Sequence, residues 1–197
     1  RLSELEAELS KSHDNLGRLT SQLDQVNQDL ECLTSCDPLT GLANRNLFYD
    51  QLGGYIAVAR REKRKLLLLV LDVNAFKDVN DSLGHRAGDS VLKEVSKRIS
   101  GVLRDSDTAA HLGGSEFGVV LPTAATIDGA MVVAQKIASA VEAPIQVDGH
   151  RLVLGVSIGI SLFPDNGTDE KGVVSLALVA MNEAKRSGGG FVACAPD

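Results

Sequence analysis

Two short stretches of the sequence combine residue types that could carry out phosphoryl-transfer chemistry. Asp72 closes an apolar strand, and Ser115-Glu116 lies in the turn of a hairpin built on Gly113-Gly114. Oxygen ligands that meet at one edge of a sheet can hold Mg²⁺, which neutralises triphosphate oxygens while a base or positioned group handles the attacking hydroxyl. Ordinary solvent-facing strand ends give the same pattern, so the pattern alone does not decide between the two.

The elements that would position these residues alternate along the chain. We expect helices over residues 46–64, 82–104, 125–141 and 169–186. We expect strands over 65–72 and 152–162, and hairpin arms over 109–112 and 117–121. This order predicts an α+β fold in which helices flank an antiparallel-rich central sheet.

A seven-residue leucine repeat precedes these elements. The first core position is occupied by Leu2, Leu9, Leu16, Leu23 and Leu30, and the second by Leu5, Leu19, Val26 and Leu33, with a break at Ser12. A stripe of two positions in seven is too narrow for a helix folded against its own domain, and it favours a coiled coil. The repeat ends at Asp37-Pro38. We therefore expect a coiled-coil helix over 1–35, pairing in a homodimer of open orientation, and a globular domain over 36–197.

Composition argues against some partners and compartments. The net charge of −6 and the pI near 5.2 do not suit a nucleic-acid-binding surface. The apolar run Leu66 to Leu71 is far shorter than the roughly 20 residues of a membrane span. An odd number of cysteines, Cys32, Cys36 and Cys194, predicts thiols without a disulfide and a cytoplasmic location. The opening within a helical repeat, without Met, suggests a piece of a larger protein.

Several motifs stand in order over about residues 36–190. They are Asp37-Pro38-Leu39-Thr40-Gly41-Leu42-Ala43-Asn44-Arg45, Leu71 to Asp81, Gly84-His85-Arg86-Ala87-Gly88-Asp89, Gly113-Gly114-Ser115-Glu116-Phe117, Val156 to Ser161 and Ala184-Lys185. On these motifs the chain is identified as a member of the GGDEF (diguanylate cyclase) family. The resemblance implies a nucleotide cyclase or palm-like fold. Active members condense two GTP into cyclic di-GMP, each subunit of a dimer presenting one GTP.

The resemblance also implies a metal site with an altered member. The family's metal lies between the strand aspartate, the next residue's carbonyl and the third signature residue, here Asp72, Val73 and Ser115. That third residue is Asp or Glu in the family, where it holds the metal and is assigned as base. Losing a general base typically costs about 10²- to 10⁴-fold in rate. Serine can still ligate Mg²⁺, and Glu116 could replace the missing carboxylate, so weak metal binding and residual catalysis stay open.

Further departures from the family pattern point the same way. Asn74 replaces a second strand aspartate, His111 replaces an arginine before the two glycines, and Gly189 replaces an arginine that contacts phosphate. The last helix carries Leu178 and Asn182 within the stretch where the family has an Ala-Asp…Tyr pattern. A single substitution could be an engineered change, whereas several scattered substitutions indicate that selection on catalysis has relaxed.

Nucleotide-recognition positions are better kept. Asn80 and Asp89 match the family's guanine-binding residues, and an amide with a carboxylate suits the acceptor and donor groups of guanine. Lys77 and Lys185 match phosphate-side positions, although ordinary surface lysines would look the same.

Arg104-Asp105-Ser106-Asp107 matches the family's inhibitory RxxD site in its distance from the signature. The Arg104 guanidinium can pair with phosphate or guanine acceptors, and Asp107 can accept from guanine. The second-side arginine of that site is not evident, because counting along the chain leads to Gln135.

Three functions are compatible with these residues. The leading hypothesis is a degenerate GGDEF regulatory domain that binds cyclic di-GMP, GTP or both, with the coiled coil relaying the state of an upstream sensor. The alternatives are an active diguanylate cyclase that uses Glu116 or water, and a structural dimer adaptor without ligands.

Overall fold

A computed structural model of the chain describes residue 13 and residues 16–22, 35–123 and 126–194. The chain divides into two compact units, Arg1–Cys36 and Asp37–Asp197. In the first unit residues 16–22 are helical, and Leu16 and Leu19 are largely exposed. Most of the leucine stripe lies outside the described residues. The coiled coil and its dimer therefore stay predictions, as does the domain division drawn from the sequence.

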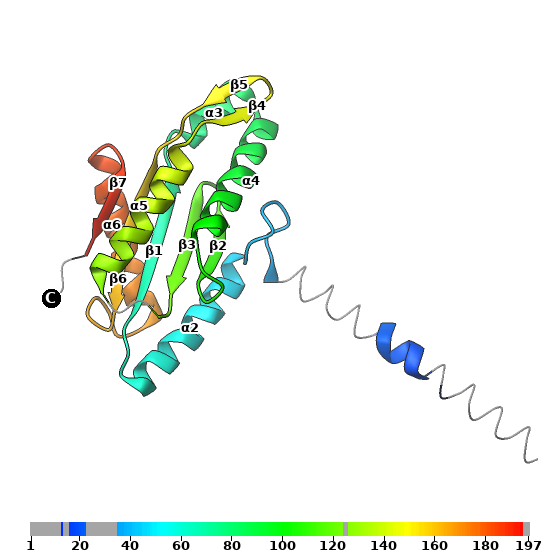
Figure 1. Cartoon of the computed structure of the whole chain (residues 1–197), viewed down its shortest axis with the longest axis vertical. Helices are drawn as coiled ribbons and strands as arrows, with labels where there is room; N and C mark the ends of the chain where they lie inside the picture. The colour runs from blue at the N-terminus through cyan, green and yellow to red at the C-terminus, as the bar shows by residue number, and fades with distance from the viewer. Residues whose placement is uncertain (1–12, 14–15, 23–34, 124–125, 195–197) are drawn as a thin grey trace, which may run out of the picture. The chain divides into compact units, whose positions relative to one another are not determined.

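The second unit is built on a five-stranded sheet in the order β2-β3-β1-β6-β7 (Figure 1). Its strands are β1 Leu66–Val73, β2 Thr108–Gly113, β3 Glu116–Leu121, β6 Val156–Phe163 and β7 Gly190–Ala193. Every neighbouring pair is antiparallel except β6 and β7, which run parallel. The expected antiparallel-rich α+β fold is confirmed.

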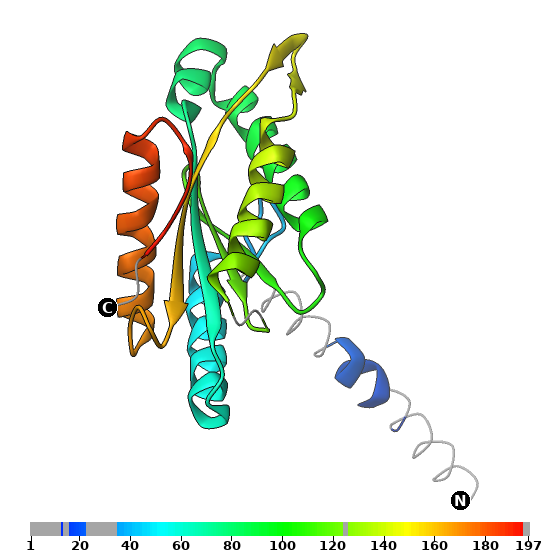
Figure 2. The ribbon, with the colours of Figure 1, turned by 60° about the vertical axis from the view of Figure 1, so that its left-hand side comes forward.

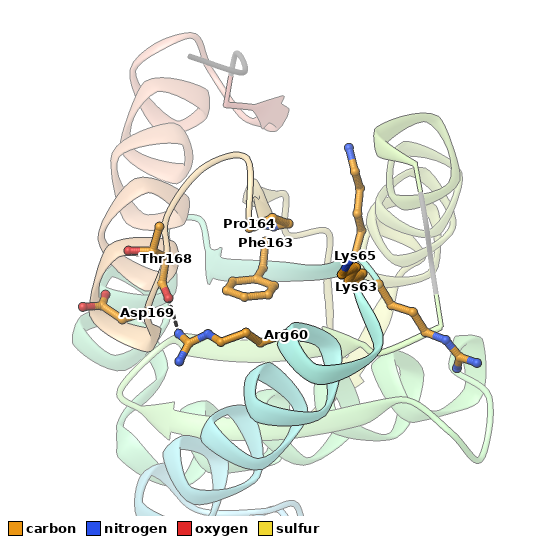
Figure 3. Close-up of a pocket in the computed structure, with 8 residues that line it drawn as sticks. Arg60, Lys63, Lys65, Phe163, Pro164, Thr168 and Asp169 are labelled. Atoms are coloured by element: carbon orange, nitrogen blue, oxygen red, sulfur yellow. Dashed lines mark hydrogen bonds between the residues drawn. The ribbon is translucent and has the colours of Figure 1, made fainter.

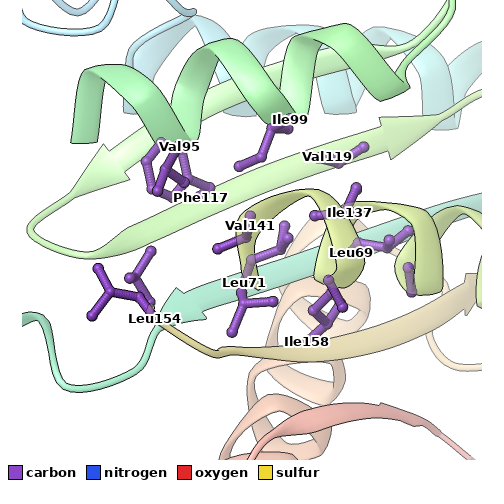
Figure 4. Packing of buried hydrophobic residues seen from close by; sticks show 14 of the residues in the cluster. Leu69, Leu71, Val95, Ile99, Phe117, Val119, Ile137, Val141, Leu154 and Ile158 are labelled. Carbon is purple, nitrogen blue, oxygen red and sulfur yellow. The ribbon is translucent and has the colours of Figure 1, made fainter. Parts of the chain in front are cut away.

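Helices cover both faces of this sheet (Figure 2). One face carries α2 Arg45–Glu62 and α6 Glu170–Arg186, and the other carries α4 His85–Val102 and α5 Ile127–Glu142. Side chains of β1 alternate between the two layers. Leu67, Leu69 and Leu71 pack with α4 and α5 (Figure 4), and Leu66, Leu68 and Val70 pack with α2 and α6. Burial on both faces explains why this strand is a continuous apolar run.

The structure contains one helix that the sequence-based prediction lacks. The helix expected over 82–104 corresponds to α4, which begins at His85, and α3, which spans Phe76–Leu83, precedes it. Gly84 separates them with a φ of +83°, in a region that glycine adopts without steric cost. Gly84 ends α3 and begins α4, so the two helices can run in different directions.

Three short strands are absent from the sequence-based prediction. The expected strand over 152–162 is shorter, because Ile145–Val147 (β4) and His150–Leu152 (β5) form a separate hairpin. The third, β7, follows the glycines after α6. Each has three or four residues, too few for a clear alternation of apolar and polar positions.

Two further expectations concern the cysteines and membranes. No disulfide joins Cys36 and Cys194, the two cysteines within the described residues. Burial, with the nearby Glu183 carboxylate, raises the pKa of the Cys194 thiol, which donates to the Leu176 carbonyl at 3.0 Å. Among the helices that the structure describes, none combines the length and apolar character needed to cross a membrane.

Candidate functional site

The strand register brings the predicted acidic positions together. Asp72 lies near the end of β1, directly opposite Glu116 of β3 on one side and Ser157 of β6 on the other. Opposite residues of an antiparallel pair point to the same face, so Asp72 and Glu116 are close neighbours. The sheet edge predicted from the sequence is therefore formed.

The turn before Glu116 depends on two glycines. Gly113 and Gly114 have φ values of +111° and +58°, and the register between β2 and β3 shifts at this point. Side chains other than glycine are strained in this part of conformational space. This turn places Ser115, whose carbonyl accepts a hydrogen bond from the Val73 amide at 3.1 Å, beside the end of β1.

The Asp72 carboxylate is bonded on both oxygens. The Ser115 hydroxyl donates to Oδ1 at 2.5 Å, and the Lys185 ammonium of α6 donates to Oδ2. The Asp72 side chain is only 5% exposed, whereas that of Lys185 is 53% exposed. A buried carboxylate requires a compensating charge or hydrogen bonds. Lys185 and Ser115 supply both, and they do so within the protein itself.

These donors are a poor match for a tightly bound Mg²⁺. That ion usually needs one or two carboxylates with near-octahedral oxygen geometry. Here Asp72 is the strand carboxylate, position 115 offers a neutral hydroxyl, and the Val73 carbonyl is the third group that the sequence suggested. No cluster of three or more His, Cys, Asp or Glu side chains that could hold a metal occurs in the described part of the chain. In the structure both Asp72 oxygens are engaged by Ser115 and Lys185, and weak Mg²⁺ binding stays a prediction.

His111 connects the signature turn to the start of the globular unit. The imidazole is 7% exposed, and its Nδ1 lies 3.1 Å from Oδ1 of Asp37 while its Nε2 lies 3.1 Å from the Gly114 carbonyl. The ring also packs at 5.1 Å from the Phe117 ring. Sequence analysis noted His111 only as a departure from the family, and its role in fixing the turn comes from the fold.

Asp37 is held by the motif in which it stands. The Thr40 amide and hydroxyl both donate to its Oδ1, at 2.8 and 2.7 Å. Burial acts to raise the pKa of Asp37, but the hydrogen bonds from Thr40 and the contact with His111 outweigh it, so the pKa lies below its usual value. The ionised carboxylate is therefore the form that stabilises this corner.

Replacing Thr40 by valine should expose this contribution. Because a hydrogen bond to a charged group contributes about 1.5–3 kcal/mol, we expect a loss of about that size in the free energy of unfolding at pH 7. A carboxyl whose pKa is lowered by folding stabilises the protein above its unfolded pKa of about 4 and loses this effect as the pH falls through the folded value. Urea denaturation at pH 7 and pH 3 should show the difference shrinking at the lower pH. Thr40→Ser, which keeps the hydroxyl, should behave like the wild type.

Asn74, which stands where the family has a second strand aspartate, is hydrogen-bonded to β6 and to the residue that precedes it. Its side-chain oxygen accepts a hydrogen bond from the Ser157 hydroxyl at 2.7 Å, and its backbone N–H donates to the Gly155 carbonyl at 2.9 Å. A β-carbon on Gly189 would lie 2.9 Å from the Asn74 amide nitrogen. An arginine at position 189 would therefore meet Asn74, so the two departures from the family pattern are coupled in space.

The predicted guanine residues lie on the two helices that Gly84 separates. Asn80 is on α3 and Asp89 is on α4, on either side of Gly84. A β-carbon on Gly88 would overlap the Asn80 side-chain oxygen and would lie 3.2 Å from the Phe76 ring. Gly88 thus gives Asn80 its room. Lys77 is exposed on α3 and forms no ion pair with the residues that the structure describes.

The Arg104/Asp107 pair lies apart from the signature turn. It forms the tight turn between α4 and β2, where Asp107 accepts from the Arg104 amide at 3.0 Å and from the Ser106 hydroxyl at 3.4 Å. The turn precedes Thr108, at the other end of β2 from Gly113, roughly 17 Å away at the rise of a strand. The Arg104 side chain is exposed. The structure therefore separates the predicted inhibitory pair from the Asp72 cluster.

Comparison with known proteins agrees with this architecture. Residues 34–190 match the family described as "Diguanylate cyclase, GGDEF domain". The chain belongs to the GGDEF family. Its match to the diguanylate cyclase TpbB of Pseudomonas aeruginosa is 36% identical over 190 residues, covering 96% of this chain and 44% of TpbB. The match to the cyclic di-GMP phosphodiesterase NbdA of the same organism is 36% identical over 176 residues, covering 89% and 22%.

A solved GGDEF structure resembles the chain over nearly its whole length. The structure of the coiled coil and GGDEF domain of DgcB from Caulobacter crescentus in complex with c-di-GMP is 30% identical to this chain, with a TM-score of 0.83. The match covers 96% of this chain and 99% of the DgcB chain. The chain spans between about a fifth and just under half of the length of the curated relatives named above. It is thus a GGDEF domain in cyclic di-GMP signalling.

Sequence reasoning missed one feature of this GGDEF domain that the structure makes central. Lys185 was assigned to the phosphate side of a nucleotide, but here its ammonium is bonded to Asp72. The two residues are 113 positions apart in the sequence. No local spacing signals such a pair, and only the packing of α6 against β6 and β1 reveals it.

Proposed function

We propose that this chain is a degenerate GGDEF regulatory domain that binds cyclic di-GMP, GTP or both, with little or no catalysis. On this proposal the segment over residues 1–35 pairs in a homodimer and relays the state of an upstream sensor. Catalysis and binding depend on different residues, so losing the first does not require losing the second.

The state of the Asp72 carboxylate is the observation that carries this proposal. Both of its oxygens are engaged, one by the Ser115 hydroxyl and one by the Lys185 ammonium. A hydroxyl at position 115 cannot act as a general base at neutral pH, and it adds no charge for a divalent cation. The lysine takes the electrostatic role that a metal would otherwise have beside Asp72. The arrangement supports a site that is stable without metal.

Nucleotide recognition has separate support. Asn80 and Asp89 come from α3 and α4, and the absence of a side chain at Gly88 keeps the Asn80 amide in place. For cyclic di-GMP, the Arg104 guanidinium is exposed beside Asp107, which is preorganised by the Arg104 amide. Both pairs present donors and acceptors that suit guanine or phosphate.

The test of the proposal is a product assay joined to titration. Purified protein incubated with GTP and Mg²⁺ should form no cyclic di-GMP above the level of the Asp72→Ala variant, as measured by chromatography. Calorimetry should show binding of at least one of the two nucleotides. Asn80→Ala should weaken GTP binding, and Arg104→Ala should weaken cyclic di-GMP binding, each by about tenfold or more because a charged or buried hydrogen bond is lost.

Glu116 favours one alternative function. It lies directly opposite Asp72 in the strand register and is only partly exposed, so a second carboxylate is present beside the first. If Glu116 replaced the missing acidic residue, the protein would be an active diguanylate cyclase. Cyclic di-GMP formation that disappears in both Asp72→Ala and Glu116→Gln would establish this and contradict our proposal. Binding of neither nucleotide would instead indicate a structural dimer adaptor.

A further inference from the structure

A basic pocket lies at the opposite end of the sheet from the signature turn. It has a volume of about 580 Å³ and is formed by the connection between α2 and β1 and by the loop between β6 and α6 (Figure 3). Leu66 and Phe163 pair at this end of β1, whereas Asp72 pairs with Glu116 at the other end. Six residues of strand separate the two ends, or roughly 20 Å. The pocket is therefore distinct from the Asp72 cluster, and neither Arg104 nor Asp107 is among the residues that line it.

Four cations line the pocket, and two of them have no carboxylate partner among the described residues. Lys65 bonds Asp165 at 2.7 Å, and Arg64 is paired with Glu62 at 3.2 Å. The Arg60 guanidinium donates instead to the neutral Thr168 carbonyl at 2.6 Å, so its charge is not neutralised. Lys63 forms no ion pair with the described residues. On a chain of net charge −6, this is a local excess of positive charge.

The carboxylate that also lines the pocket is already occupied. Asp169 is the N-cap of α6, and its Oδ1 accepts a hydrogen bond from the Gly172 amide at 2.8 Å. It therefore stabilises the start of its own helix, and its single negative charge leaves an excess of positive charge from Arg60 and Lys63 to face an incoming anion.

The inner wall of the pocket is apolar. Phe163 is buried at 3% exposure, and Pro164 follows it in the loop. In Figure 3 the Phe163 ring lies between Lys63 and Lys65 on one side and Thr168 and Asp169 on the other, with Arg60 reaching across toward Thr168. An apolar wall with a few placed cations is the usual composition of a pocket for small organic ligands, which occupy about 300–1,000 Å³.

We propose that this pocket binds a small organic anion, with its phosphate or carboxylate on Arg60 and Lys63 and its apolar body against Phe163 and Pro164. The proposal does not depend on whether the site around Asp72 binds nucleotide or catalyses a reaction. Phosphate and carboxylate ligands would meet the same requirement, which is one anionic group joined to an aromatic or aliphatic body of a size that fits the pocket. An anion alone or an apolar body alone would satisfy only half of the contacts.

Four simple probes separate these contributions. They are 1-naphthyl phosphate, 1-naphthoate, neutral 1-naphthol and inorganic phosphate, each titrated into the full chain labelled with ¹⁵N. We expect the two naphthyl anions to shift the amides of residues 60–65 and 163–169, and the stronger of them identifies the preferred headgroup. The neutral naphthol should bind at least about fivefold more weakly, the effect of one exposed charge pair at 4 Å. Inorganic phosphate keeps the charge but lacks the naphthyl body, so it should also bind more weakly because no apolar surface is buried.

Lys63→Gln is the decisive variant, because its side chain forms no ion pair with the described residues and its loss should leave the fold intact. It should weaken binding of the naphthyl anions about fivefold, by the same estimate for one charge pair. Lys136→Gln on the exposed face of α5 is the matched control and should change nothing. Arg60→Gln should weaken binding as well. The proposal is overturned if the shifts fall at Lys185 or Arg104 instead, or if Lys63→Gln and Arg60→Gln both bind the probes like the wild type.

Discussion

Replacing Ser115 by aspartate should make the stability of the domain depend on Mg²⁺. The Ser115 hydroxyl now lies 2.5 Å from Oδ1 of Asp72, so a carboxylate at position 115 would face the Asp72 carboxylate closely. Two like charges 4 Å apart near a protein surface repel by about 4 kcal/mol, of which Lys185 would offset a part. Without a divalent cation the variant should therefore be less stable than the wild type, and with one it should recover.

The size of the recovery can be estimated by linkage. A cation present at about a hundred times its dissociation constant stabilises the folded state by about 2.7 kcal/mol. For a domain of this size that is about 5–10 °C in melting temperature. Thermal unfolding with and without Mg²⁺ measures the effect without any reference to activity. The wild type and the neutral variant Ser115→Asn should show little shift. An equal Mg²⁺ shift in the wild type would mean that a metal binds at Asp72 despite the serine.

The surroundings of Asp72 explain how the fold would be kept if, as we propose, catalysis is lost. A cluster of acidic residues is unfavourable unless a cation is bound, whereas Ser115 and Lys185 satisfy Asp72 within the chain. The changes at Asn74 and Gly189 fit together in the same way, since the backbone of Gly189 lies against the Asn74 side chain. The substitutions therefore form a mutually compatible set at one end of β1.

Much of this architecture could be predicted from the sequence because its signals are local. The run Leu66 to Leu71 predicts a strand buried on both faces, and Gly113-Gly114 predicts the turn that brings Ser115 to the end of that strand. The helix α3 was missed because its eight residues include only one buried apolar position, Val79, too few for a helical periodicity. The hairpin at 145–152 was missed because each of its strands has only three residues.

Features that join distant segments could not be predicted in this way. The bonds from His111 to Asp37 and from Lys185 to Asp72 depend on which strands are neighbours in the sheet and on how α6 lies across it. The basic pocket also needs the α2 to β1 connection and the β6 to α6 loop to meet. The resemblance to the family pointed to His111 and Lys185, but not to their partners in the fold.

Gly159→Ala should strongly destabilise the domain. On β6, Ser157, Gly159 and Ser161 alternate with the buried Ile158 and Ile160, and Ser161 donates to the Val173 carbonyl at 2.8 Å. Small residues on this face let the backbone of α6 lie directly on the strand. A β-carbon at position 159 would overlap the Ala177 carbonyl and would lie 2.9 Å from the Met181 α-carbon.

Because the obstacle is backbone, no side-chain rotation can relieve it and α6 must move away from β6. Overpacking of this kind costs about 1–3 kcal/mol and occasionally more, and we expect about 3 kcal/mol from urea denaturation. Gly101→Ala is the matched control, since a β-carbon there meets open space near the end of α4 and should stabilise by about 0.5–1 kcal/mol. Lys185 lies one helical turn beyond Met181, so a shift of α6 should also withdraw its ammonium from Asp72. Wild-type stability in Gly159→Ala would show that α6 does not approach the strand this closely, and the bond from Lys185 to Asp72 would lose its structural basis.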